Sequence, residues 1–222
     1  MRRFDFAKFL EYNKKYRITS LFSVPPIYLL IAKSPLVIDQ FDTLRHAVSG
    51  AAPLGKELQL AVQAKLGRGR TGLNQTWGLS ETTGSITAMP RDRSDETGSV
   101  ACLVANNYAR IVDDDHKDVE PGQPGEIWVR GPVVTKGYYN NDEINKEAFV
   151  DGWFCTGDIG IFKNGLFYIV DRKKVCSGHT PGEGGFSQLA SPLLSVNQAY
   201  LLTHENRRNL SNTKACRLLQ PS

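Results

Sequence analysis

Hydrophobic spacing at the start of the chain predicts a helix, a strand and a second helix in turn. The apolar positions of the first segment recur at helical spacing opposite several lysines, and they are Phe4, Phe6, Phe9 and Leu10. This pattern predicts a surface helix from about Asp5 to Tyr16. The run over 18–24 predicts a buried strand, which Pro25-Pro26 ends. Because proline is favourable in the first helical turn, we predict a helix over 27–33.

A second strand and helix follow in the same alternation. The run 44–48 is strand-like, and the apolar residues that recur after it at helical spacing are Leu54, Leu58, Ala61, Val62 and Leu66. We therefore predict a helix over 55–66 that Gly67 ends. Strands that alternate with helices predict part of a parallel α/β sheet, in which ligands bind beyond the carboxyl ends of the strands.

The later part of the chain has a different pattern. The polar stretch 91–96 is typical of a linker, and the strand-like runs after it are 108–112, 126–129, Phe162 and 166–170. Asn164-Gly165 is the strongest hairpin signal. The predicted fold class is therefore α/β, with a partial parallel α/β subdomain over 1–92 and a small β-rich subdomain over 93–174.

The last segment, 175–222, shows neither the two-residue period of a strand nor the 3.6-residue period of a helix. Only Glu183 and Glu205 are acidic there, and Gly, Ser, Leu and Asn dominate. We predict a divergent, disordered tail. The codons for Val175-Cys176 can begin like a splice donor, which favours a translated intron or a frameshift, and a genuine divergent tail is the alternative.

Composition excludes several function classes. The 222 residues carry a net charge of +4 and scattered basic residues, so we expect no nucleic-acid partner. The longest apolar run, 27–32, is too short to span a bilayer, and no signal peptide is visible, so we expect no membrane partner. The four cysteines form no C-x-x-C pair, which favours a reducing compartment. We predict a cytoplasmic location, because the chain shows no peroxisomal C-terminal signal.

The first candidate site follows the strand at 44–48. Its sequence, Ser49-Gly50-Ala51-Ala52-Pro53-Leu54, is built from small residues that let a flat ligand lie on the backbone. Residues 50–57 also resemble a phosphate-binding P-loop, but Glu57 stands where that loop needs a hydroxyl, and Pro53 removes a backbone donor. A P-loop hydrolase is therefore disfavoured.

The second candidate site is the stretch 74–83. Its side chains combine an amide, an aromatic ring, a hydroxyl and a carboxylate, supplied by Gln75, Trp77, Ser80 and Glu81. Such a set suits a purine, with the hydroxyl on a phosphate and the carboxylate on a divalent metal. The structural alternatives are a serine N-cap followed by an acid, and an aromatic residue of the core.

Together with later segments, these stretches resemble the adenylate-forming acyl-CoA synthetases, and most closely the 4-coumarate–CoA ligase branch. The segments that carry the resemblance are Ser49–Leu58, Gln75–Thr82, Pro124–Pro132, Lys136–Asn140, Asp151–Gly160 and Ile169–Lys174. It runs from the N-terminus to Lys174. It implies the later half of an AMP-binding domain, with a distorted β-barrel beside the α/β sheet and a hinge at 171–174.

The resemblance also implies a set of site residues. Those implied to bind AMP or ATP are Ser49, Gly50, Ala51, Ala52, Pro53, Gln75, Thr76, Trp77, Gly78, Ser80, Asp158 and Arg172. Those implied to line the acyl pocket are Val48, Ala51, Thr76 and Gly78. Glu81 is the implied magnesium ligand, and Asp158 and Arg172 would reach the ribose. Thr76 departs from the family's glycine, so we expect a shallower pocket or an impaired site.

The family's enzymes use ATP to convert a carboxylic acid into an acyl-adenylate, and coenzyme A then displaces AMP. The implied cofactors are ATP/AMP, Mg²⁺ and coenzyme A, and the partner is a small-molecule carboxylic acid whose identity stays open. Neither the family's Ser/Thr/Gly phosphate loop nor its C-terminal lysine is found, so no catalytic residue is assigned. We expect a truncated ligase that is inactive alone, or alternatively a non-catalytic nucleotide-binding or regulatory module.

Overall fold

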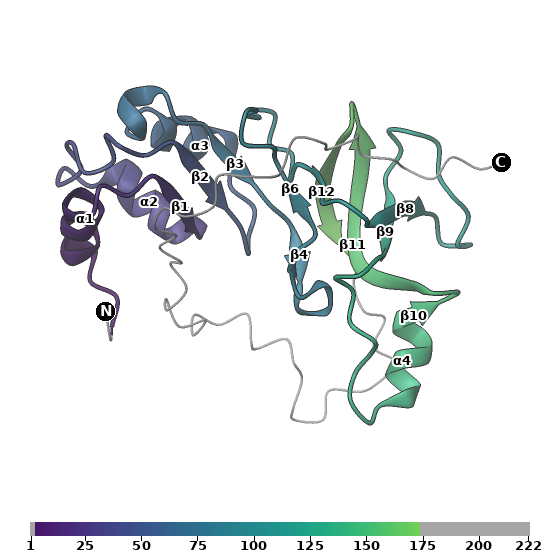
Figure 1. Cartoon of the computed structure of the whole chain (residues 1–222). Helices are drawn as coiled ribbons and strands as arrows, with labels where there is room; N and C mark the ends of the chain where they lie inside the picture. Colours follow the sequence, from purple (N-terminus) through teal and green to yellow (C-terminus); the bar gives the residue numbers. More distant parts are fainter. Residues whose placement is uncertain (1–2, 174–222) are drawn as a thin grey trace, which may run out of the picture.

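The computed structural model describes residues 3–173, and the predictions for the tail lie outside these residues. A small parallel sheet with three helices lies at one end of the molecule, and a larger antiparallel sheet lies at the other (Figure 1). Both the parallel and the antiparallel parts of the predicted α/β fold are confirmed. No helix among the described residues is long and apolar enough to cross a membrane.

The parallel sheet carries the first candidate loop. Its strands are β1 (Ser20–Ser23), β2 (His46–Ser49) and β3 (Leu73–Gln75), in the order β1-β2-β3. The register places Phe22 beside Val48, and Val48 beside Asn74. Because all three strands run the same way, the segments after β2 and β3 leave the sheet at the same edge.

Three helices accompany this sheet, as predicted, with shifted ends. They are α1 (Phe6–Lys15), α2 (Pro25–Lys33) and α3 (Lys56–Gln63). The Asp5 carboxylate caps α1 by accepting from the Lys8 backbone N–H at 2.9 Å. Helix α2 begins at Pro25, before the predicted Ile27, because the first helical positions need no backbone donor. Helix α3 ends at Gln63, and a short 3₁₀ turn, Gly67–Gly69, follows.

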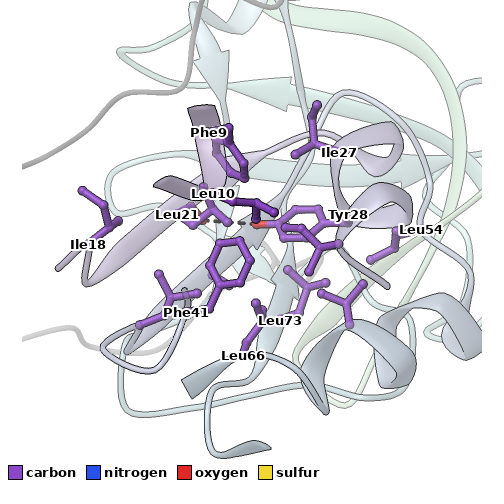
Figure 2. Close-up of a cluster of buried hydrophobic side chains, with 14 residues drawn as sticks. Phe9, Leu10, Ile18, Leu21, Ile27, Tyr28, Phe41, Leu54, Leu66 and Leu73 are labelled. Carbon is purple, nitrogen blue, oxygen red and sulfur yellow. Dashed lines mark hydrogen bonds between the residues drawn. The ribbon is translucent and has the colours of Figure 1, made fainter. Parts of the chain in front are cut away.

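One buried cluster joins the helices to the sheet (Figure 2). Leu21, Ala47 and Leu73 supply one residue from each strand. Tyr28 of α2 is fully buried, and its hydroxyl donates to the carbonyls of Val48 at 2.9 Å and Leu21 at 3.3 Å. This tyrosine therefore ties α2 to the strands just before the first candidate loop.

The antiparallel sheet is built around one long strand. Its members are β8 (Tyr108–Val112), β9 (Gly125–Arg130), β10 (Phe149–Val150), β11 (Trp153–Lys163) and β12 (Leu166–Arg172). Strand β9 lies on one side of β11, and β10 and β12 share the other side, so the Asn164-Gly165 hairpin is confirmed. The implied distorted barrel is corrected to an open sheet among residues 3–173, because β8 pairs only with β9.

Two short hairpins connect the sheets. Strand β4 (Gly78–Leu79) pairs with β5 (Gly84–Ser85), and β6 (Thr87–Ala88) pairs with β7 (Cys102–Leu103). Side chains from these hairpins and from β8, β9, β11 and β12 form a second buried cluster. Asp95, in the predicted linker, is buried and accepts from the backbone N–H groups of Thr97 and Ser99 at 3.1 and 3.0 Å. The linker is therefore anchored to the fold.

Besides the short strands β4, β5, β6, β7 and β10, two larger elements were not predicted from the sequence. Of β11, only Phe162 was expected in a strand, because Gly157, Asp158 and Gly160 interrupt the apolar pattern. Helix α4 (Asp142–Ala148) is short and buries none of its residues, so it lacks an apolar stripe. Its signal is the N-cap Asn141, whose side chain accepts from the Ile144 N–H at 3.3 Å.

Candidate nucleotide site

The loop 49–54 is held against β3 by the Gln75 side chain. The amide oxygen of Gln75 accepts from the Leu54 N–H at 3.0 Å, and its NH₂ donates to the Leu54 carbonyl at 3.2 Å. Gln75 is buried, and the structure uses its amide to position the loop. Ala51 adopts a positive φ of 71°, and Ala51, Ala52 and Pro53 are exposed. The loop thus presents a fixed, open backbone surface.

Thr76 joins this loop to the next segment. Its N–H donates to the Ser49 carbonyl at 2.9 Å, and its hydroxyl donates to the Thr87 carbonyl at 2.5 Å. Its methyl group packs on Gly50, where an added Cβ would lie 2.9 Å from Thr76 Cγ2. The threonine methyl therefore occupies space between the two candidate loops, at the position where the resemblance implies glycine.

The four implied acyl-pocket residues differ in exposure. Val48 and Thr76 are half-buried, whereas Ala51 and Gly78 are exposed. A cavity of about 760 Å³ lies elsewhere, beside Thr19, Arg45 and Thr71, where the parallel strands begin. None of the predicted site residues lines this cavity.

Trp77 and Asp158 meet across the two sheets. The Trp77 indole N–H donates to Asp158 Oδ2 at 2.8 Å, although 81 positions separate the residues. The indole ring packs in the second buried cluster and is 8% exposed. The backbone N–H of Trp77 donates to the Thr87 hydroxyl at 2.8 Å, which fixes the ring's attachment point. Trp77 is therefore both a core residue and a partner of the predicted ribose carboxylate.

Asp158 and Arg172 lie side by side on paired strands. The register of β11 and β12 places them opposite each other, and Arg172 Nε lies 3.6 Å from Asp158 Oδ1. The Asp158 side chain is 13% exposed, whereas that of Arg172 is 76% exposed. The structure thus brings together the two residues that the resemblance assigns to the ribose.

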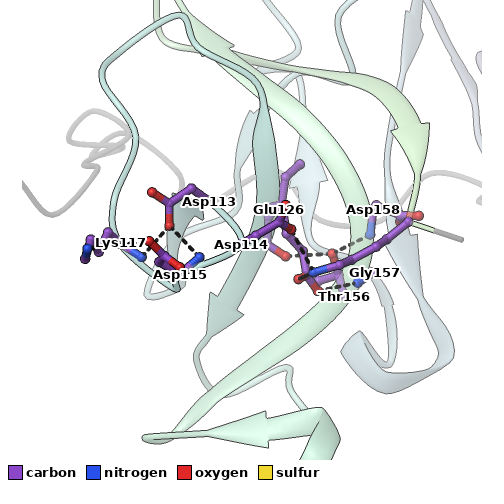
Figure 3. A network of polar contacts seen from close by, with 10 residues as sticks. Asp113, Asp114, Asp115, Lys117, Glu126, Thr156, Gly157 and Asp158 are labelled. Carbon is purple, nitrogen blue, oxygen red and sulfur yellow. Dashed lines mark hydrogen bonds and ion pairs between the residues drawn. The ribbon is translucent and has the colours of Figure 1, made fainter. Parts of the chain in front are cut away.

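A buried carboxylate supports the turn before Asp158 (Figure 3). Glu126 accepts from the Gly157 N–H at 3.0 Å, and Lys173 Nζ lies 3.4 Å from its other oxygen. Lys173 also lies 3.5 Å from Asp114 Oδ1, and its backbone N–H donates to the Gly157 carbonyl at 2.7 Å. Partial burial acts to lower the pKa of Lys173, but the two carboxylates outweigh it and raise that pKa. The sequence did not predict that Glu126 supports this turn, because it is a single acidic residue within a strand-like run.

Glu81 contacts a different segment of the chain. It lies in the short turn Ser80–Thr82, where Ser80 is exposed, and its Oε1 accepts from the Tyr138 hydroxyl at 2.5 Å. Burial, followed by the hydrogen bond and the charge of Glu81, raises the pKa of Tyr138 to about 12. The sequence signal for Tyr138 was its place in Lys136–Asn140, but nothing in that segment indicated its partner.

The single carboxylate of Glu81 suits a metal ion that is bound to the phosphates of a nucleotide. Among residues 3–173, no group of three His, Cys, Asp or Glu side chains is close enough to hold a metal ion. Mg²⁺ at nucleotide sites is commonly bound by one or two carboxylates together with substrate phosphates and water. A single oriented carboxylate therefore fits nucleotide-borne Mg²⁺ better than a resident metal ion.

Comparisons with known proteins identify the family that the chain resembles. The family described as "AMP-binding enzyme" matches residues 1–139. A putative acyl-coenzyme A synthetase of Emericella nidulans is 48% identical over 175 residues, covering 78% of this chain and 31% of that protein. The 4-coumarate–CoA ligase 1 of Solanum tuberosum is 43% identical over 184 residues, covering 78% of this chain and 33% of that protein.

Solved structures show the same relationship. The crystal structure of ATP-bound MatB from Rhodopseudomonas palustris matches with a TM-score of 0.70 and 33% identity, covering 77% of this chain and 34% of MatB. The chain therefore spans about a third of the length of the relatives that it matches.

Proposed function

Because the chain belongs to the AMP-binding enzyme family, we propose that it contributes the adenine-nucleotide site of an acid–CoA ligase. The single observation that carries this proposal is the contact of Trp77 and Arg172 with the Asp158 carboxylate. A carboxylate has lone pairs for several donors, so Asp158 can also accept from ribose hydroxyls. The exposed residues 51–53 and the exposed backbone of Gly78 would then face the purine.

The proposed reaction is that of the family. ATP and a small-molecule carboxylic acid give an acyl-adenylate, and coenzyme A then displaces AMP. Relatives named 4-coumarate–CoA ligase favour an aromatic acid, with Val48, Ala51, Thr76 and Gly78 near the acyl group. Glu81 would bind Mg²⁺, and the cation would neutralise the phosphate charge. The relatives' names favour a ligase over a separate regulatory module. Inactivity of this polypeptide alone and its cytoplasmic location stay predictions.

Nucleotide titration tests the site. We expect AMP to bind with an affinity on the order of millimolar, equivalent to about 4 kcal/mol. The substitution Asp158→Ala should weaken AMP binding about tenfold or more, because hydrogen bonds to a charged group contribute about 1.5–3 kcal/mol each. Glu81→Ala should change AMP binding less, because a monophosphate needs the metal less than ATP does. Line broadening of AMP resonances in NMR spectra measures all three affinities.

A matched control is Asp115→Ala, because the Asp115 side chain is 77% exposed and pairs only loosely with Lys117 at 3.6 Å. This variant should bind AMP like the unmodified chain. Normal AMP binding by the Asp158→Ala variant, with its fold intact by circular dichroism, would show that the proposed site is wrong.

A further inference from the structure

The turn that carries Glu81 is bound on two sides by the segment 133–138. The Thr135 N–H donates to the Glu81 carbonyl at 2.8 Å, and the Thr83 hydroxyl donates to the Val133 carbonyl at 3.0 Å. The Tyr138 hydroxyl then donates to Glu81 Oε1 at 2.5 Å. One segment therefore fixes both the backbone and the carboxylate of Glu81.

Tyr138 is itself held in place by helix α4. The Tyr138 N–H donates to Asn145 Oδ1 at 2.6 Å, and the Asn145 NH₂ donates back to the Tyr138 carbonyl at 2.9 Å. Gly137 permits this approach, because it has a φ of 139° and an added Cβ would lie 2.8 Å from Asn145 Oδ1. The reciprocal pair sets where the tyrosine ring leaves the backbone.

We propose that Tyr138 is a positioning residue that orients the Glu81 carboxylate toward a divalent cation carried by the bound nucleotide, an inference that rests on the proposed function. Its hydroxyl fixes Oε1 in one orientation. Within residues 3–173, no further hydrogen bond or ion pair occupies Oε2, which leaves that oxygen for the cation. Because the hydrogen bond already restricts the Glu81 side chain to one rotamer, binding the cation costs less side-chain entropy.

The neighbouring tyrosine provides a contrast. Tyr139 is 93% exposed, whereas Tyr138 is 38% exposed. Replacing either ring with phenylalanine removes one hydroxyl and keeps nearly the same shape. Tyr139→Phe is therefore a control for Tyr138→Phe at the adjacent position.

The experiment uses Mn²⁺ as the probe cation and ATP as the nucleotide on the full 222-residue chain. Water-proton relaxation, measured as the protein is added to preformed Mn²⁺–ATP, gives the affinity of the chain for the metal–nucleotide complex. Loss of a partner that orients a ligating carboxylate typically weakens metal binding about 10–100-fold. We expect at least a tenfold loss for Tyr138→Phe and no change for Tyr139→Phe. Metal-free AMP affinity should be the same in both variants.

The outcomes separate this inference from the proposed function. If Glu81→Ala binds Mn²⁺–ATP like the unmodified chain, then the proposed metal role of Glu81 fails, and the role of Tyr138 fails with it. If Glu81→Ala loses Mn²⁺ but Tyr138→Phe matches Tyr139→Phe, only the inference about Tyr138 is wrong. An equal loss of metal-free AMP binding in Tyr138→Phe would mean that the tyrosine is merely structural, which also overturns the inference.

Discussion

At the scale of single residues, the indole of Trp77 links two parts of the chain through one hydrogen bond to Asp158. We expect Trp77→Phe to destabilise the fold, because the substitution removes the donor from a mostly buried carboxylate. The loss should be about 1–3 kcal/mol in the free energy of unfolding, as for other buried groups left without a partner. Urea denaturation followed by circular dichroism measures it.

Trp128→Phe is the matched control for this substitution. Trp128 is 2% exposed, and its indole N–H has no hydrogen-bond partner among the described residues. Its replacement removes a similar ring area but no hydrogen bond. If both variants lose the same stability, the Trp77–Asp158 bond contributes little and the ring packing dominates.

The sequence indicated candidate site residues, but it did not indicate which residues they contact. Local order along the chain indicated that Gln75, Trp77 and Glu81 belong to one stretch after a strand. The contacts of Trp77 with Asp158 and of Glu81 with Tyr138 join residues 81 and 57 positions apart. Spacing along the chain does not specify such contacts, because they depend on how the two sheets pack. Gln75 was assigned to the ligand, whereas in the structure its amide holds Leu54.

At the scale of elements, the hairpin of β4 and β5 brings two backbones into close contact at Gly78. A Cβ added there would lie 1.9 Å from the Gly84 carbonyl oxygen. We expect Gly78→Ala to cost about 1–3 kcal/mol or more, because the backbone must move to relieve the overlap. The midpoint of thermal unfolding reports the loss.

Gly55→Ala is the comparison for the hairpin variant. Gly55 has a φ of −63°, and an added Cβ there meets nothing within 4 Å. The same chemical change should therefore leave the midpoint nearly unchanged. A Gly78→Ala variant as stable as Gly55→Ala would contradict the close approach of β4 and β5.

Elements with a strong period were predictable, and elements shaped by tertiary contacts were not. The amphipathic spacing of α1 and α3 and the two-residue turn at Asn164-Gly165 are local signals, and the structure confirms them. Strand β11 lacks such a signal because its glycines serve contacts with neighbours: a Cβ on Gly160 would lie 2.4 Å from Ile127 Cδ1. Its partners β9 and β12 determine its conformation.

At the scale of the whole molecule, the parallel sheet ends at β1, which pairs only with β2 among the described strands. Parallel sheets are usually covered on both faces, and an unpaired strand edge invites association. Phe22 on β1 is half-buried. We therefore expect the polypeptide to self-associate, and Phe22→Lys to reduce the association. Size-exclusion chromatography with light scattering measures this effect.

A lysine placed elsewhere tests whether the reduced association comes from the edge of β1 or from the added net charge. Val170→Lys places a lysine on β12, where the valine is 56% exposed. If both lysine variants reduce association equally, net charge explains the effect and the edge of β1 does not. A monomeric unmodified chain would contradict the prediction itself.

Gln75 and Trp77 are two positions apart, yet each is fixed in a different half of the molecule. Gln75 is bonded to Leu54 beside the first cluster, and Trp77 is packed in the second. A ligand lying along this stretch would touch both halves at once. If the docked arrangement of the two halves strengthens ligand binding, then the bound ligand stabilises that docked arrangement by the same free energy. The nucleotide would then act as a non-covalent cross-link between the two sheets.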